Sequence, residues 1–270
     1  MRSLGQNFLV DQNIRLKILG ALDLKPSDII LEIGSGKGEL TSLISQRVNK
    51  IYSLEIDKRL YSVLNESFRA ERNIRVINQD ILKFDLSQFI KIEKIKTRIK
   101  VFGNIPYYVS SPIIEHLLNF RANLSAIYIS VQKEFAERVV ASPGPKDYGA
   151  FSCFVQYYTL PKIIFGISKH CFKPSPKVES SFLELKIREV PAVYVKDESA
   201  FFKIIRTAFN QRRKVLRNSL LGVVTPEVLD IFFNEFALSR GIRPEDLTLE
   251  NFAFLANRQD LVKNTNTVPQ

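Results

Sequence analysis

The sequence predicts an α/β protein with two domains. The first, residues 1–190, is built on an open and mostly parallel β-sheet, and the second, residues 191–270, is small and all-helical. Apolar runs of strand length alternate with helical patterns through the first domain, which is typical of a sheet covered by helices on both faces. A glycine-rich turn joins the first strand to its helix, and only helical periodicity remains after Pro191.

Five buried strands are expected in the first domain, because short runs of Ile, Val, Leu and Phe are bounded by polar segments. They cover residues 29–33, 51–56, 74–77, 99–102 and 126–131. Helical patterns at 40–48, 58–68 and 112–119 follow the first, second and fourth of these strands. Two later strands, at 162–167 and 180–187, have no clear helical pattern between them, which predicts an antiparallel hairpin at the sheet edge.

Helical patterns fill the second domain at residues 200–210, 212–221, 226–236 and 249–257. Pro191 and the acidic pair Asp197-Glu198 mark the change of composition before them. The boundary is therefore expected near residue 190.

Composition excludes several classes of protein. No apolar run approaches the ~20 residues of a membrane span, and the N-terminus lacks the apolar core of a signal peptide. The 2 Cys and 2 His residues lack metal-ligand spacing, so we expect no metal site and a cytoplasmic protein with reduced thiols. The net charge of +11 favours a polyanionic partner, although a generally basic proteome would also explain it.

The turn after the first strand has the features of a cofactor-binding loop. Gly34, Ser35, Gly36 and Gly38 allow a tight turn and close approach of a ligand to the backbone. The spacing is G-x-G-x-G, which differs from the G-x-G-x-x-G of dinucleotide binders, and no P-loop pattern is present.

Acidic residues follow the second and third strands. Glu55, with Ile56 after it, can accept hydrogen bonds from ribose hydroxyls, and Asp80 can accept one from an adenine amino group while Ile81 packs on the ring. Each acid alone could be a solvated loop residue. Together with the glycine turn they meet at the carboxyl ends of parallel strands, where such sheets bind ligands, and this favours a nucleoside site.

The fourth strand runs into Asn104, Ile105, Pro106 and Tyr107. Proline stiffens the backbone, so the Ile105 carbonyl has a fixed direction beside the Asn104 side-chain oxygen. Two acceptors next to a flat ring fit an amino group on a planar heterocycle. The same residues also fit a strand end and a proline turn packed with tyrosines.

These motifs together resemble those of the ribosomal RNA adenine N6-dimethyltransferases. The resemblance includes GQNFL at residues 5–9, ILEIGSGKGELT at 30–41, Glu55, QD at 79–80, NIPY at 104–107, FKPSPKV at 172–178, and FNQRRK with LRNSL between 209 and 220. It implies a Rossmann-like, seven-stranded class I methyltransferase domain that binds S-adenosyl-L-methionine. It also implies that Asn7 and Leu9 contact the cofactor and that Phe172 and Tyr107 clamp the target base.

The late motifs resemble the housekeeping branch, which dimethylates two adjacent adenosines near the 3′ end of the small-subunit RNA during ribosome biogenesis. The macrolide-resistance branch, which modifies one adenosine of the large subunit, is the alternative, since Tyr108 stands where housekeeping enzymes often carry Asn. A non-catalytic RNA-binding assembly factor and an NAD-linked enzyme are further alternatives. We expect a monomer without a metal.

Basic residues predict the RNA-facing surface. A stretch of 15 residues contains no acid. The expected RNA-binding residues are Lys173, Lys177, Lys203, Arg206, Arg212, Arg213, Lys214 and Arg217. On a helical domain the last six can line one face toward phosphates, although a solvated helix face is the simpler alternative.

Overall fold

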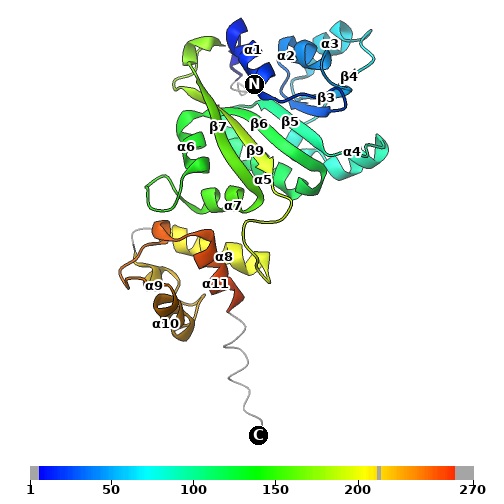
Figure 1. Ribbon diagram of the computed structural model, residues 1–270. Coiled ribbons are helices and arrows are strands. Elements are labelled where there is room, and N and C mark those ends of the chain that lie inside the picture. Colours follow the sequence, from blue (N-terminus) through cyan, green and yellow to red (C-terminus); the bar gives the residue numbers. More distant parts are fainter. Residues whose placement is uncertain (1–5, 212–213, 259–270) are drawn as a thin grey trace. The chain divides into compact units, whose positions relative to one another are not determined.

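The structure, a computed structural model, describes residues 6–211 and 214–258 and contains a seven-stranded sheet. The strand order is β4-β3-β2-β5-β6-β9-β7 (Figure 1). The parallel strands are β2 (Ile29–Ile33), β3 (Lys50–Glu55), β4 (Ile74–Asn78), β5 (Ile99–Asn104) and β6 (Leu124–Gln132). β9 (Ser180–Ile187) pairs antiparallel with β6, and β7 (Thr159–Ile167) is outermost. The predicted α/β class and its seven strands are confirmed.

The middle of the sheet is apolar on both faces, which explains the continuous apolar runs in the sequence. Leu31 of β2 lies opposite Val101 of β5, which in turn lies opposite Ile127 of β6. All three side chains are fully buried. Residues paired in this way lie on the same face of the sheet, so the three side chains form one row of its core.

Short helices connect the strands. They are α1 (Gln12–Ala21), α2 (Glu39–Ser45), α3 (Lys58–Ser67), α4 (Leu86–Ile92), α5 (Ser110–Asn119) and α6 (Lys133–Val140), with the 3₁₀ turns η1 (Ile81–Lys83), η2 (Tyr107–Val109), η3 (Arg121–Asn123) and η4 (Lys169–Cys171). Asp11 and Asp57 cap α1 and α3, accepting from the Ile14 and Arg59 amides. The apolar patterns do not predict α1, α4 or α6.

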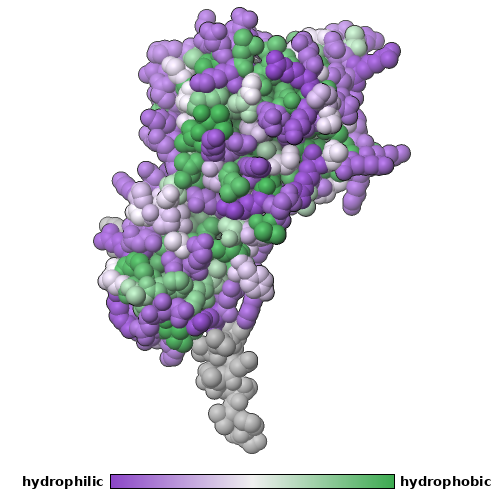
Figure 2. All heavy atoms as spheres, viewed as in Figure 1, coloured by the Kyte–Doolittle hydropathy of each residue, from purple (hydrophilic) through white to green (hydrophobic). Residues whose placement is uncertain are grey.

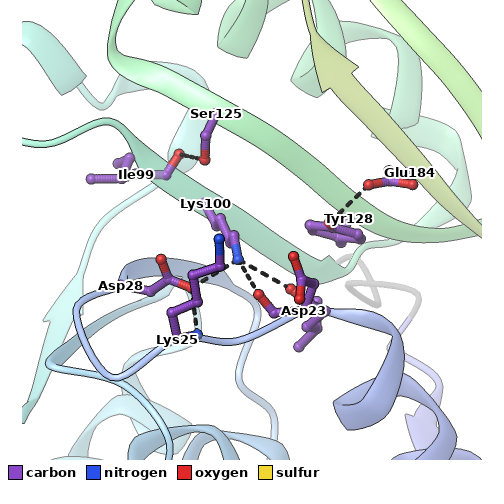
Figure 3. A network of polar contacts seen from close by, with 9 residues as sticks. Asp23, Lys25, Asp28, Ile99, Lys100, Ser125, Tyr128 and Glu184 are labelled. Carbon is purple, nitrogen blue, oxygen red and sulfur yellow. Dashed lines mark hydrogen bonds and ion pairs between the residues drawn. The ribbon is translucent and has the colours of Figure 1, made fainter.

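A lysine anchors the amino ends of the central strands. Lys100, near the start of β5, donates to Asp28 at 2.8 Å and to the backbone carbonyls of Leu22 and Asp23. Figure 3 shows the side chain reaching from β5 toward the loop before β2. In the same view Tyr128 of β6 donates to Glu184 of β9 at 2.8 Å. The contacts of Lys100 therefore tie the amino end of β5 to the loop before β2, and the Tyr128 bond ties β6 to β9.

The described chain separates into two compact units. The first extends to Ala136 and includes Leu160–Ile187; the second comprises Glu137–Thr159 and the described residues from Arg188 on. The second unit holds α7 (Ala150–Tyr158), α8 (Glu198–Asn210), α9 (Leu216–Ser219), α10 (Pro226–Glu235), η5 (Pro244–Asp246) and α11 (Leu249–Asn257). The expected helix at 212–221 is thus shorter, since only Leu216–Ser219 is α-helical among its described residues.

Aromatic packing explains why residues 137–159 group with the later helices and not with the sheet. Tyr157 of α7 lies 5.1 Å from Phe201 of α8, measured between ring centroids, and Tyr158 donates to Glu198 at 2.6 Å. A boundary at residue 190 therefore does not coincide with the compact units. A division of labour between residues 1–190 and 191–270 stays a prediction.

The described residues contain no membrane-spanning helix and no cluster of metal ligands. None of these helices is long and apolar enough to cross a membrane. No group of three or more His, Cys, Asp or Glu in this part of the chain could hold a metal ion. Hydrophilic residues cover much of the face seen in Figure 2, with apolar residues scattered between them.

Candidate active site

A cavity of about 290 Å³ lies at the carboxyl ends of the parallel strands. Its walls include residues 6–9, 33–37, 54–56, 79–82 and 104–109. These segments follow β2, β3, β4 and β5, except for 6–9, which precede the sheet. Open parallel sheets bind small ligands at this edge, and the volume is close to the lower end of the range for such sites, about 300–1,000 Å³.

The glycine turn between β2 and α2 forms one wall. Gly34, Gly36 and Gly38 have φ angles of +75°, +58° and +82°, which L side chains rarely adopt. A Cβ on Gly36 would lie 3.1 Å from the Phe8 ring. Only glycine therefore lets Phe8 pack this closely on the turn.

A buried carboxyl group holds the glycine turn in place through hydrogen bonds. Glu32 is 2% exposed and accepts from Ser35 Oγ at 2.8 Å and from Thr41 Oγ1 at 2.6 Å. Burial raises the pKa of Glu32 to about 7, against the opposing effect of these hydrogen bonds. Because Ser35 also contacts Ser53 of β3, the group ties the turn to α2 and to the next strand.

Glu55 ends β3 and faces the cavity. Its side chain is 2% exposed; Oε1 accepts from the Asp57 amide at 2.9 Å and Oε2 from the Gly36 amide at 3.3 Å. Burial raises its pKa above the usual value for glutamate. The described residues supply no cation for this carboxylate. Each oxygen keeps acceptor capacity, which suits ligand hydroxyl groups.

Apolar and acidic side chains continue this wall. Ile56 and Asp80 line the cavity together with Ile81, which is buried. Asp80 also caps η1, accepting from the Leu82 amide at 3.0 Å. The cap holds the carboxylate at the end of β4.

Asn104, Ile105, Pro106 and Tyr107 lie together on the opposite side, after β5. The Asn104 amide nitrogen donates to the Asn7 carbonyl at 3.1 Å, and no described residue donates to its side-chain oxygen. The half-buried Tyr107 forms a hydrogen bond with Ser180 of β9 at 2.5 Å, and burial raises its pKa. The bond from Asn104 to Asn7 fixes the amide so that its oxygen stays available as an acceptor.

A two-stranded pair covers the cavity. β1 (Phe8–Leu9) pairs antiparallel with β8 (Phe172–Lys173), Leu9 lying opposite Phe172. Asn7 and Leu9 line the cavity, and the Arg15 guanidinium donates to the Leu9 carbonyl at 3.0 and 3.1 Å. The N-terminal segment is therefore held over the site by backbone pairing and by α1.

The structure places Phe172 outside the cavity wall, and its role as a clamp for a base stays a prediction. Its ring is 2% exposed, belongs to the hydrophobic core with Leu9, and is absent from the cavity wall. The physical reason is the pairing with β1, which turns the ring inward. Tyr107 remains the aromatic residue of the predicted clamp that faces the cavity.

The expected RNA-binding residues fall into separate groups. Lys173 and Lys177 are exposed on the sheet unit, and Lys203, Arg206 and Lys214 are exposed on the helical unit. Arg217 instead forms an ion pair with Asp230 at 3.0 Å, which Arg240 shares. Arg212 and Arg213 lie outside the described residues.

Three further residues form part of the site although no motif assigns them a role. Phe8 covers the glycine turn, Glu32 supports it, and Tyr108 stands at the cavity rim. Each is next to, or inside, a run already singled out in the sequence. Their positions follow from pairing and burial, which short patterns do not specify.

The fold and the site together define a class I methyltransferase. The features that define it are a seven-stranded sheet with β9 beside β6, a glycine turn after the first strand of that sheet, and an acidic residue after the next strand. The sequence matches the model of the family described as "Ribosomal RNA adenine dimethylase" over residues 1–259. The chain therefore belongs to that family.

Curated relatives agree with the family. The chain is 42% identical over 255 residues to "Ribosomal RNA small subunit methyltransferase A" of Caldanaerobacter subterraneus subsp. tengcongensis, covering 94% of each chain. The Streptococcus pneumoniae (strain P1031) protein of the same name is 40% identical over 262 residues, covering 95% of this chain and 90% of the relative.

Solved structures share the fold. The crystal structure of a dimethyladenosine transferase from Plasmodium falciparum matches with a TM-score of 0.78 and 25% identity, covering 92% of this chain and 95% of that one. The structure of the 23S rRNA methyltransferase ErmE matches with a TM-score of 0.73 and 24% identity, covering 94% and 100%. The second likeness concerns the fold alone.

Proposed function

We propose that this enzyme uses S-adenosyl-L-methionine to dimethylate N6 of two adjacent adenosines in the 3′-terminal hairpin loop of small-subunit ribosomal RNA, during ribosome biogenesis. The observation that carries the proposal is that Asn104, Ile105 and Tyr107 lie together in the wall of the cavity. The names of the curated relatives favour the small subunit over the large one.

The cavity fits the proposed cofactor by the chemistry of its donors and acceptors. Glu55 is buried without a cation among the described residues, as expected for a group that accepts from two ribose hydroxyls. Ile56 and Ile81 offer apolar surface to an adenine ring, and Asp80 offers an acceptor for its amino group. The backbone of Gly34 and Gly36 is open to the methionine part. When bound, the cofactor supplies an electrophilic sulfonium methyl group.

The catalytic residues act mainly by position. The Asn104 oxygen and the Ile105 carbonyl accept hydrogen bonds from the two N6–H groups, so the nitrogen lone pair is drawn out of the ring plane and directed at the methyl group. N6 would gain the methyl group that the cofactor supplies, and the sulfur of the cofactor would keep the electron pair. The extra N6 proton leaves to solvent, so no strong base is required. Correct placement supplies most of the acceleration.

Tyr107 holds the target ring. Its hydroxyl is fixed by Ser180, so the ring can form a stacking surface with little loss of freedom on binding. An adenine must be turned out of the RNA to reach it. Lys173 and Lys177 on the sheet unit, and the exposed basic residues of the helical unit, then hold the RNA phosphates.

The test is methyl transfer from labelled S-adenosyl-L-methionine to separate small and large ribosomal subunits that lack the modification. We expect dimethylation of two adjacent adenosines in the small subunit. Small subunits that already carry the methyl groups are the matched control and should accept no label. Label in the large subunit alone would contradict the assignment of the substrate, and no label in either subunit would contradict the enzymatic role.

A further inference from the structure

An aromatic side chain stands exposed at the rim of the cavity. Tyr108 is 69% exposed, although it lines the cavity next to Tyr107. It makes no hydrogen bond or ring contact with the residues that the structure describes. A large ring that is apolar on both faces gains by stacking when a flat ligand is present. Its position therefore marks a contact for something that reaches the cavity mouth.

The backbone fixes where this ring stands. Tyr107–Val109 form the 3₁₀ turn η2, in which the Val109 amide donates to the Pro106 carbonyl at 3.2 Å. Pro106 restricts the entry to the turn, and α5 begins directly after it at Ser110. Little backbone ordering is needed on binding, so a contact with Tyr108 keeps most of its free energy.

The two neighbouring tyrosines differ in their environment. Tyr107 is half-buried and tied to Ser180, whereas Tyr108 projects outside. One therefore serves a group that enters the cavity, and the other a group that stays at the mouth. We propose that Tyr108 stacks on the RNA base next to the adenine that enters the cavity. This inference rests on the proposed function.

The chemistry of the RNA explains why such a surface is useful. When a base is turned out of a strand, its neighbour loses a stacking partner. An aromatic ring at the cavity mouth replaces that partner and keeps the strand in place. Since the two proposed targets are adjacent, the base on Tyr108 is itself a target in one of the two reactions.

The cofactor is the other flat ligand that could occupy Tyr108. Its adenosine end is assigned to the ends of β3 and β4, where Glu55 and Asp80 lie. Tyr108 follows β5, which is separated from β3 by β2. At the usual strand spacing, two strands correspond to about 10 Å. The proposal therefore predicts that Tyr108 contributes nothing to the affinity for the cofactor.

The first measurement compares Tyr108→Ala with Tyr108→Phe. Affinity is measured by fluorescence anisotropy with a synthetic hairpin RNA whose loop contains two adjacent adenosines. We expect about a tenfold loss for Tyr108→Ala, equivalent to about 1.4 kcal/mol, and nearly wild-type affinity for Tyr108→Phe. The slope of log affinity against log salt should not change, because the ring carries no charge. Calorimetry should give unchanged affinity for S-adenosyl-L-methionine.

The second measurement removes the neighbouring base. Two hairpins keep a single adenosine, the other target being replaced by uridine, and carry an abasic nucleotide on the 5′ or the 3′ side of that adenosine. Wild type should bind one of these two RNAs about as weakly as Tyr108→Ala binds the intact RNA. On that abasic RNA, wild type and Tyr108→Ala should have equal affinity.

Equal binding of the intact RNA by wild type and Tyr108→Ala would overturn the proposal. So would a loss that persists on both abasic RNAs, or an equal loss of cofactor affinity. These are binding measurements. A wild-type enzyme that binds the hairpin but methylates no ribosomal subunit would contradict the proposed function and leave the stacking result to stand by itself.

Discussion

Replacement of Asn104 tests the proposed chemistry most directly. Its side chain has two tasks: the amide nitrogen donates to the Asn7 carbonyl at 3.1 Å, and the oxygen is free to accept from the substrate amine. Asn104→Ala removes both. Loss of one polar contact in the transition state lowers turnover about 10²–10³-fold. Loss of the neutral bond to Asn7 is worth about 0.5–1.5 kcal/mol, so cofactor affinity should fall by no more than about tenfold.

Asn104→Asp separates the two tasks. The aspartate keeps an acceptor oxygen but sets a second oxygen against the Asn7 carbonyl, where a donor is needed. We expect it to loosen the N-terminal cover, so that cofactor affinity falls at least as much as in Asn104→Ala. Turnover at saturating cofactor should fall less than in Asn104→Ala, because an acceptor remains.

The assay is single-turnover methylation with saturating cofactor and RNA, together with calorimetry for the cofactor. Thermal unfolding without ligand serves as the control for folding. A rate for Asn104→Ala within about threefold of wild type would refute the reasoning, because a transition-state contact cannot be lost at so small a cost. Asn104 would then be a structural residue at the end of a strand.

Four further predictions follow from the site and the helical unit. Glu55→Gln should weaken S-adenosyl-L-methionine binding about tenfold to hundredfold in calorimetry, since a charged acceptor is worth about 1.5–3 kcal/mol; unchanged affinity would remove Glu55 from the site. The pKa of Glu32 is about 7 in the folded state and 4.5 ordinarily. Between these pH values the folded state binds more protons than the unfolded state, so the contribution of Glu32 to the free energy of unfolding falls as pH rises. The melting temperature of Glu32→Gln minus that of wild type should therefore increase over this pH range, and a constant difference would contradict the assignment. Gly38→Ala should lower stability by about 2 kcal/mol or more, because φ is +82° and the new Cβ would lie 2.8 Å from Leu64; Gly144→Ala, with nothing within 4 Å, is the matched control and should cost less. Lys203→Ala with Arg206→Ala should lower the log–log salt slope of RNA binding by up to about one unit for each phosphate contact, while cofactor affinity stays constant; an unchanged slope would mean that both side chains only face solvent.

The sequence predicts the sheet well because its strands are buried on both faces. Apolar runs around Leu31, Val101 and Ile127 locate the strands without any knowledge of their partners. The ends of these runs also locate Glu55 and Asn104, because polar residues that end parallel strands lie at the edge where such sheets bind ligands. Local sequence patterns are enough to predict a site residue when its position depends only on the strand that carries it.

The remaining features depend on partners that are distant in the chain. β1 and β8 have two residues each, too few for any periodicity, yet their pairing buries Phe172 and removes it from the cavity. Residues 137–159 join the helical unit because Tyr157 packs on Phe201, a contact that composition around residue 190 does not reveal. Short or long-range pairings of this kind need a structure.

β5 joins the anchoring contacts of Lys100 and the proposed catalytic Asn104 in a single strand of six residues. Lys100 fixes its beginning to Asp28, and Asn104 ends it. The strand cannot slide lengthwise without breaking the lysine's bonds, so the anchor at one end sets the height of the amide at the other. Replacement of Lys100 would remove these bonds and loosen the amino end of β5, which would shift the Asn104 amide. Variants selected for activity should preserve this lysine although it touches no ligand.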